Sequence, residues 1–101
     1  MTFLIKKPVK TGEVVTIKLT TAEELIARLD ADNDSTIRIS RPMTLSYGPQ
    51  GVGMTPWLIT SDNDNSVEID KRFVMFMTPT MKKAADQYIE GTTGIKTVSK
   101  I

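Results

Sequence analysis

The feature that most constrains the fold is a series of short apolar-alternating segments between residues 15 and 39, separated by polar breaks. Residues 15–19 alternate between apolar and polar side chains, and residues 36–40 repeat this alternation. A period of two is typical of a strand that has one face in the core. We therefore predict strands at both places.

The segment between these two strands supports two interpretations. Residues 21–24 read as a capping box, and good helix formers follow through Leu29, which favours a helix. Leu25, Ala27 and Leu29 also alternate with their neighbours, which favours a strand over residues 23–30 that pairs with the preceding strand across a tight turn. The residues alone leave both interpretations open.

The middle of the chain contains further strands interrupted by proline, glycine and acidic residues. Pro42 predicts a bend or bulge in the third strand, because proline cannot donate to the ladder. Residues 48–53 are expected to form a hairpin tip, since they lack the Gly-Lys-Ser/Thr ending of a phosphate-binding loop. Residues 55–70 are then expected to form one long return strand, bulged at the polar run 62–66.

A segment near the C-terminus, residues 73–77, is apolar at every position, so that neither of its faces suits water. We predict that it pairs with a neighbouring subunit, and the competing explanation is that a following helix covers it. The expected interface comprises Phe73, Val74, Met75, Phe76 and Met77.

The helix expected after this strand begins with Thr78 as N-cap and Pro79 in the first turn, and Gly91 predicts its end. At 101 residues the chain is expected to form one domain. Its expected parts are an N-terminal arm (1–12), a β barrel (13–78), a C-terminal helix (79–91) and a tail (92–101).

Cysteine and histidine are both absent, which removes thiolate nucleophiles, disulfides, common zinc ligands and the usual acid–base side chain near neutral pH. We therefore expect a non-enzymatic protein with no catalytic residue, no metal and no cofactor. The formal net charge is +1, so a nucleic-acid partner would have to meet a local basic patch. The apolar run at residues 3–5 is too short for a signal peptide or a membrane span, which favours a cytoplasmic protein without a membrane partner.

The acidic run at residues 30–34 resembles the opening of a calcium loop but does not complete it. Its sixth position is Ser35 where glycine is needed, and its twelfth is Arg41 where a bidentate glutamate should close the shell. Residues 62–64 resemble the same motif even less. Plain polar turns are the expected structure at both places.

With strands throughout, the chain resembles the Sm-like (LSm/Hfq) family. The stretch VTIKLTTAEELIARLDADNDSTIRI (residues 15–39) resembles the first Sm motif, and VEIDKRFV (residues 67–74) resembles the second. Lys71 and Arg72 fall at the turn where that family places its basic pair. The segments GMTPWLITSDND and TPTMKKAADQYIEGTTGI are further similar to small Sm-like proteins of marine phages, of the cyanophage type.

This resemblance implies a mainly β fold: a five-stranded, strongly bent antiparallel barrel of the SH3 type with a C-terminal helix. It implies a strand over residues 23–30, and a homo-oligomeric ring of about five to seven subunits. The implied function is binding of single-stranded RNA, or DNA, in nucleic-acid processing or regulation within a phage-infected bacterial cytoplasm. The residues that it places at the nucleic-acid site are Lys71, Arg72, Asp70, Asn33, Asp34 and Ser35.

Departures from the family pattern are also visible. The family's turn glycine and strand-bending glycine fall at Ala22 and Ala27, and its stacking-ring position falls at Ser35. An alternative function, from another class, is a structural or protein-interaction module of a phage that captures a partner strand at an exposed edge.

Other candidate nucleic-acid contacts have plainer explanations. Trp57, Tyr47 and Phe3 could stack on bases, but core or interface packing is the expected role of each. Three arginines could form a second basic surface, but cross-strand pairing with glutamates is expected instead. These arginines are Arg28, Arg38 and Arg41, and their expected partners are Glu23, Glu24 and Glu68.

Overall fold

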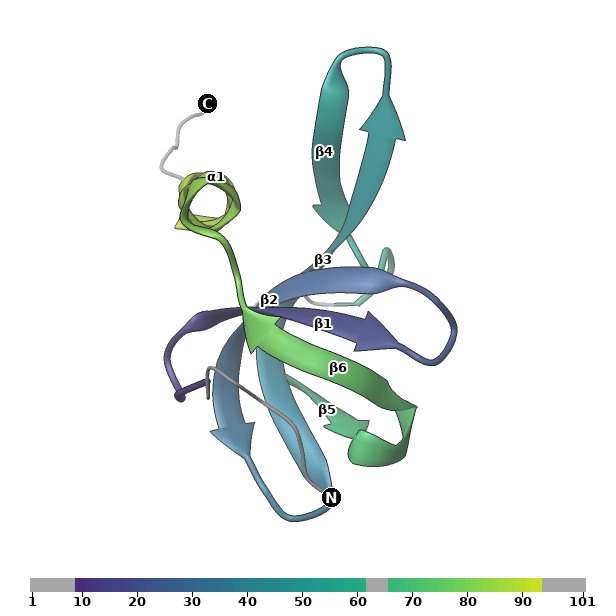
Figure 1. The fold of residues 1–101 in the computed structure, drawn as a ribbon, viewed down its shortest axis with the longest axis vertical. Helices are drawn as coiled ribbons and strands as arrows, with labels where there is room; N and C mark the ends of the chain where they lie inside the picture. The colour runs from purple at the N-terminus through teal and green to yellow at the C-terminus, as the bar shows by residue number, and fades with distance from the viewer. Residues whose placement is uncertain (1–8, 62–65, 94–101) are drawn as a thin grey trace.

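The computed structural model describes residues 9–61 and 66–93, which form a mainly β fold with one C-terminal helix (Figure 1). The strands are β1 (Val14–Leu19), β2 (Glu24–Asp32), β3 (Thr36–Gly48), β4 (Gly51–Pro56), β5 (Ser66–Asp70) and β6 (Val74–Pro79). A short 3-10 turn, η1 (Lys71–Phe73), joins β5 to β6, and the helix α1 (Lys82–Thr93) follows.

All strand pairings are antiparallel, in the order β4-β3-β2-β1-β6. β3 is 13 residues long and pairs with two partners on the same edge. Its first part, from Thr36 to Ser40, pairs with β5, and its second part, from Met43 to Gly48, pairs with β4. Within residues 9–61 and 66–93 no ladder joins β5 to β6, so the sheet is open and not a closed barrel.

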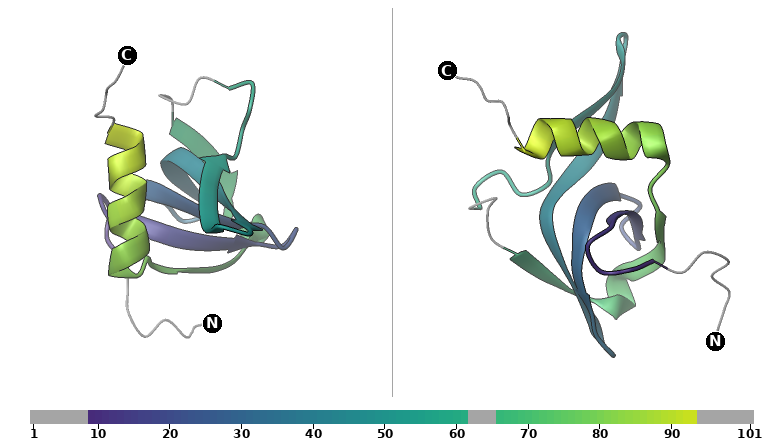
Figure 2. Two further views of the ribbon diagram at one scale, coloured as in Figure 1. Left: turned by 90° about the horizontal axis from the view of Figure 1, so that it is seen from above. Right: turned by 90° about the vertical axis from the view of Figure 1, so that its left-hand side faces the viewer.

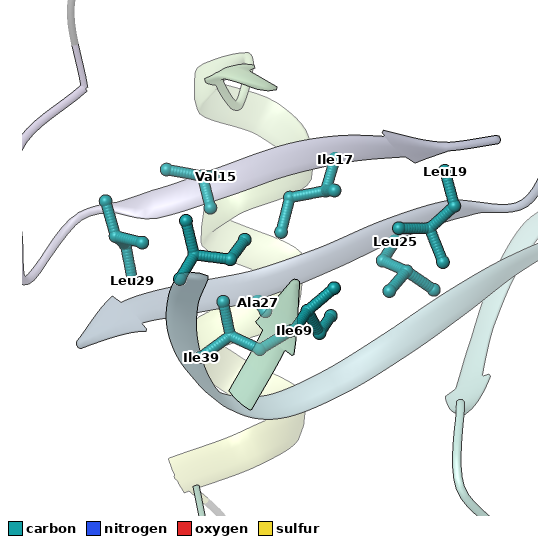
Figure 3. Packing of buried hydrophobic residues seen from close by; sticks show 9 residues of the cluster. Val15, Ile17, Leu19, Leu25, Ala27, Leu29, Ile39 and Ile69 are labelled. Atoms are coloured by element: carbon teal, nitrogen blue, oxygen red, sulfur yellow. The ribbon is translucent and has the colours of Figure 1, made fainter. Parts of the chain in front are cut away.

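The main core shows how strongly this sheet curls. Buried apolar side chains of β1, β2, β3 and β5 form one cluster (Figure 3), and Val74 and Met77 of β6 pack against it. β5 and β6, which pair with β3 and β1 respectively, therefore share one core although they do not pair with each other. The cluster comprises Val15, Ile17, Leu19, Leu25, Ala27, Leu29, Ile37, Ile39 and Ile69.

The segment that had two interpretations is a strand, β2, which pairs with β1 in a register that places Ile17 opposite Leu25. Both faces of β2 are buried: Leu25 and Ala27 point into the main core, whereas Ile26 belongs to a second cluster under α1. The buried Ile26 obscures the alternation in the sequence. Packing on both faces outweighs the local helix propensity of this segment.

The expected irregularity at Pro42 is confirmed. The β2–β3 register skips between Ile26 opposite Met43 and Arg28 opposite Ser40, as in a β-bulge. Arg41 lies in this bulge with a φ of 51°. The expected hairpin tip is also confirmed, since Gly48 pairs with Gly51 at the end of the β3–β4 ladder.

The prediction of a single long return strand over residues 55–70 is wrong. β4 ends at Pro56, and Trp57 leaves the ladder while its backbone N–H still donates to the carbonyl of Pro42 over 3.0 Å. A straight return strand cannot follow β3 across its bulge at Arg41, so β4 and β5 pair with separate halves of β3 and the described strands number six. Residues 62–65, in the expected bulge, lie outside the described residues.

The predicted helix start at Thr78 and Pro79 is wrong as well. Both residues continue β6, with Thr78 opposite Thr16, and α1 begins at Lys82. Proline is tolerated there because β6 is the last strand of the order and Pro79 is its last residue. The helix also continues through Gly91 to its end at Thr93.

α1 packs on the outer face of β2 and beside the β3–β4 hairpin (Figure 2). Tyr88 is the largest side chain of this contact and is 2% exposed. Its hydroxyl donates to the carbonyls of Ser40 (3.1 Å) and Arg41 (2.9 Å), and Arg41 donates in return to the carbonyl of Thr92 near the end of the helix. The helix is therefore fixed to the bulge of β3.

Candidate nucleic-acid interface

The turn η1 and the β2–β3 loop, which are far apart in the sequence, lie side by side. The backbone N–H of Lys71 donates to the carbonyl of Ser35 over 2.8 Å, and Asp70 pairs with Thr36 in the β3–β5 ladder. The structure thus brings the two halves of the predicted site together. Asn33, Asp34 and Ser35 are all exposed beside the turn.

Asp70 organises the turn by capping it. Its carboxylate accepts the backbone N–H of Arg72 (2.8 Å) and also the guanidinium groups Nε (3.2 Å) and Nη2 (3.0 Å) of Arg72. These hydrogen bonds from Arg72 hold the pKa of Asp70 below its ordinary value. The guanidinium lies 5.9 Å from the centre of the Phe73 ring and remains exposed to a ligand.

Lys71 is paired with a different element of the structure. Its Nζ lies 2.7 Å from Oδ1 of Asp32, the last residue of β2, and both side chains are about two-fifths exposed (39% and 40%). Both cations of the basic turn therefore already have carboxylate partners within the chain.

The loop itself is held by a chain of polar contacts. The Asn33 backbone N–H donates to the Thr36 carbonyl over 2.8 Å, and the Asn33 amide donates to the Thr36 hydroxyl over 3.3 Å. The Thr36 hydroxyl in turn donates to Oε2 of Glu68 over 3.2 Å. These contacts order the loop while its side chains remain accessible to hydrogen-bonding groups of a base or a phosphate.

Two of the three arginines donate to backbone carbonyls. Arg28 donates to the carbonyl of Gly12 (2.7 Å), and Arg41 donates to Thr92. Arg38 lies directly opposite Glu68 in the β3–β5 ladder, as expected for a cross-strand pair.

The aromatic candidates have different positions. Trp57 is partly buried against the main core, and its indole N–H donates to Oε2 of Glu23 over 3.1 Å, so packing is its role as expected. Tyr47 is 89% exposed on the β3–β4 hairpin, away from the basic turn. Phe3 lies outside the described residues.

The five residues predicted to form a subunit interface divide into two groups. Val74 and Met77 pack against the main core of their own chain, whereas Phe73, Met75 and Phe76 are 52%, 65% and 56% exposed. The β1–β6 register skips Met75, which explains why two consecutive residues of one strand both face outward. In the chain alone, α1 leaves this edge uncovered.

A groove of about 610 Å³ between α1 and the β3–β4 hairpin was not predicted from the sequence. Its apolar lining includes Ile26, Leu45, Val52, Met54, Met81 and Ala84. The signal that could have revealed it is the hairpin register, which places Leu45 opposite Met54 and Tyr47 opposite Val52 on one face. This hairpin projects from the sheet (Figure 1).

No protein-family model matches the chain, and no curated protein matches its sequence. Among the described residues, no three acidic, cysteine or histidine side chains gather as a metal-binding group. None of the helices in the part of the chain that the structure describes is long and apolar enough to cross a membrane.

Proposed function

We propose that this chain is an Sm-like, ring-forming RNA-binding protein without catalytic activity. The observation that carries the proposal is the contact between η1 and the β2–β3 loop, which gathers Lys71, Arg72 and Asp70 beside residues 33–35. In a ring, one copy of this site per subunit would face the central opening and contact phosphates and bases.

The arrangement of the strands supports the Sm-like assignment. Apart from the β3–β4 hairpin, five strands in the order β5-β3-β2-β1-β6 curl around one core, and a 3-10 turn joins the first to the last. This is the order expected of a small, strongly bent barrel, and the hairpin is an excursion from it.

The two open edges support ring formation. Within residues 9–61 and 66–93, β5 pairs only with β3, and β6 pairs only with β1. Pairing of β6 in one copy with β5 of the next would satisfy both edges and cover Phe76. Because these are two different surfaces, the contact is heterologous, and a heterologous contact forms a ring when its rotation closes. We expect closure at about five to seven subunits.

The assembly is tested by sedimentation or light scattering of the purified protein, together with its absorbance ratio for bound nucleic acid. We expect a single closed oligomer, and Phe76→Ser should shift it toward monomer because it removes apolar surface from the β6 edge. Ile59→Ser is the matched control, since Ile59 is also exposed (90%) but lies outside the strands. A wild-type monomer at micromolar concentration would refute the ring.

RNA binding is tested by fluorescence anisotropy with single-stranded RNA at low salt, and with DNA of the same sequence. The double variant Lys71→Ala, Arg72→Ala should bind more weakly, and its salt slope should fall by ~0.7 for each lost phosphate contact. The double variant Lys82→Ala, Lys83→Ala removes the same charge from α1 and should retain wild-type affinity. Equal affinities of the two variants would place binding elsewhere, and no wild-type binding would refute the function.

A second candidate function is a non-catalytic structural or protein-interaction module, in either case of phage origin and acting in the bacterial cytoplasm. The observation that favours it is the internal pairing of both cations with Asp32 and Asp70, which weakens attraction for phosphate. Recovery of protein complexes free of nucleic acid, with no oligonucleotide binding at low salt, would decide for this alternative.

A further inference from the structure

The two carboxylates that pair with the basic turn hold it in different ways. Asp70 is two residues from Arg72 and makes three hydrogen bonds with it, one of them to the backbone, so this pair is part of the turn's own structure. Asp32 comes from the far end of β2 and contacts Lys71 through one ion pair of 2.7 Å between partly exposed side chains.

The pair between Asp32 and Lys71 is not needed to place the lysine. The backbone of Lys71 is already fixed by its hydrogen bond to Ser35 and by the turn that Asp70 caps. Asp32 is likewise fixed by its own backbone, since it pairs with Ile37 in the β2–β3 ladder. The carboxylate of Asp32 therefore decides chiefly whether the ammonium group is free for a ligand.

We propose that Asp32 is an intramolecular competitor that lowers the affinity of Lys71 for RNA phosphate. This inference rests on the proposed function and adds a regulatory residue to that site. When a phosphate displaces Asp32, the released carboxylate lies near Asp34 in the adjoining loop and attracts a cation from solution. Binding of a phosphate by Lys71 then releases fewer counterions in total than binding by an unpaired lysine would.

The variant Asp32→Asn tests the proposal because it keeps the shape of the side chain and removes its charge. Its affinity for single-stranded RNA should rise about two- to fivefold, which corresponds to the ~0.4–1 kcal/mol of a partly exposed ion pair. Its salt slope should be steeper than the wild-type slope by up to ~0.7 per contacted phosphate.

Asp86→Asn is the matched control, since it makes the same change in net charge and frees Lys82 from a 2.9 Å pair on α1. We expect this control to match wild type in affinity and salt slope. In the double variant Asp32→Asn, Lys71→Ala the gain should disappear, because Lys71 carries it. Asp32→Ser should reproduce the gain if Asp32→Asn is poorly folded.

The outcomes separate this inference from the function on which it rests. If wild type binds RNA but Asp32→Asn binds no more tightly than Asp86→Asn, the competitor role is refuted and the function stands. If the gain persists without Lys71, it is a general charge effect, which also refutes the role. If neither wild type nor the Asp32 variants bind at low salt, the function and the inference both fail.

Discussion

The hydroxyl of Tyr88 is expected to contribute measurably to stability, and Tyr88→Phe removes it while leaving the ring. The hydroxyl donates to the carbonyls of Ser40 and Arg41, at the bulge that divides β3. Arg41 has a φ of 51°, a region that non-glycine residues seldom adopt, so this backbone needs external support. The Tyr88 hydroxyl is one such support.

The magnitude follows from what the substitution leaves behind. The ring remains buried, so the apolar contribution is retained, and the loss is one shared hydrogen bond to two backbone carbonyls. We expect a loss of ~1–1.5 kcal/mol in the free energy of unfolding, because partly buried acceptors lose their donor. For a domain of this size such a loss lowers the melting temperature by roughly 4–10 °C.

The measurement is urea unfolding followed by the fluorescence of Trp57, the only tryptophan, with Tyr47→Phe as the control. Tyr47 is 89% exposed, so removal of its hydroxyl should change stability by no more than about 0.3 kcal/mol. If Tyr88→Phe were as stable as Tyr47→Phe, the hydrogen bonds of Tyr88 would not support the bulge, and our account of how α1 is fixed would be wrong.

The pH dependence provides a second test of the same contact. Burial raises the pKa of Tyr88 above its ordinary value of 10.0, so the neutral phenol is favoured in the folded chain. Its contribution is therefore complete below about pH 10 and is lost as the pH rises through the folded-state pKa. Tyr88→Phe should show a smaller loss of stability than wild type in that alkaline range.

Three further predictions concern the turns and the core. Ala22→Gly should stabilise the chain by ~0.5–1 kcal/mol in urea unfolding, because Ala22 has a φ of 78°, a conformation that glycine adopts without strain. Ala31→Gly in β2 is the control and should destabilise the chain. Ile39→Ala, at a fully buried position of the main core, should cost ~2–5 kcal/mol by the same method. Arg72→Ala should raise the pKa of Asp70 toward its ordinary 3.8 in an NMR titration. In wild type, the stabilising contribution of Asp70 is complete above that value and is lost as the pH falls through the lowered pKa, and an unchanged titration would contradict the role of Arg72.

The extent to which the sequence predicted the fold depends on how local each signal is. Alternation located β1 and the first half of β3 because one face of each points into the core. It left β2 undecided, because Ile26 is buried under α1, a contact with a helix more than 50 residues away. Resemblance to a family, and not propensity, favoured the strand that the structure contains.

The errors near prolines have one physical cause. The predicted return strand continued through Pro56, and Pro79 was predicted to begin a helix. In the structure each is the last residue of its strand, where a missing N–H is tolerated. Whether a proline ends a strand or begins a helix depends on the neighbouring strand, which the local sequence does not reveal.

The sequence predicted that residues 33–35 would lie beside the Lys71–Arg72 turn, but it did not predict how the charges of the turn are paired. The loop that contains residues 33–35 leads into β3, and the Lys71–Arg72 turn follows β5. Because β3 and β5 pair with each other, the loop and the turn lie side by side. The pairing of Lys71 with Asp32 was not predicted, because the predicted strand ended at Asp30 whereas β2 continues to Asp32. This added pair is the contact on which the proposed competition between Asp32 and phosphate rests.

The bulge at Arg41 separates two surfaces of the molecule. The first half of β3 pairs with β5 and supports the basic turn, whereas the second half forms the projecting hairpin and one wall of the apolar groove. Figure 1 and the right-hand view of Figure 2 place η1 and the hairpin tip toward opposite ends of the molecule. Because Tyr88 fixes α1 at this bulge, the groove is built on the same contact that sets the bend of β3.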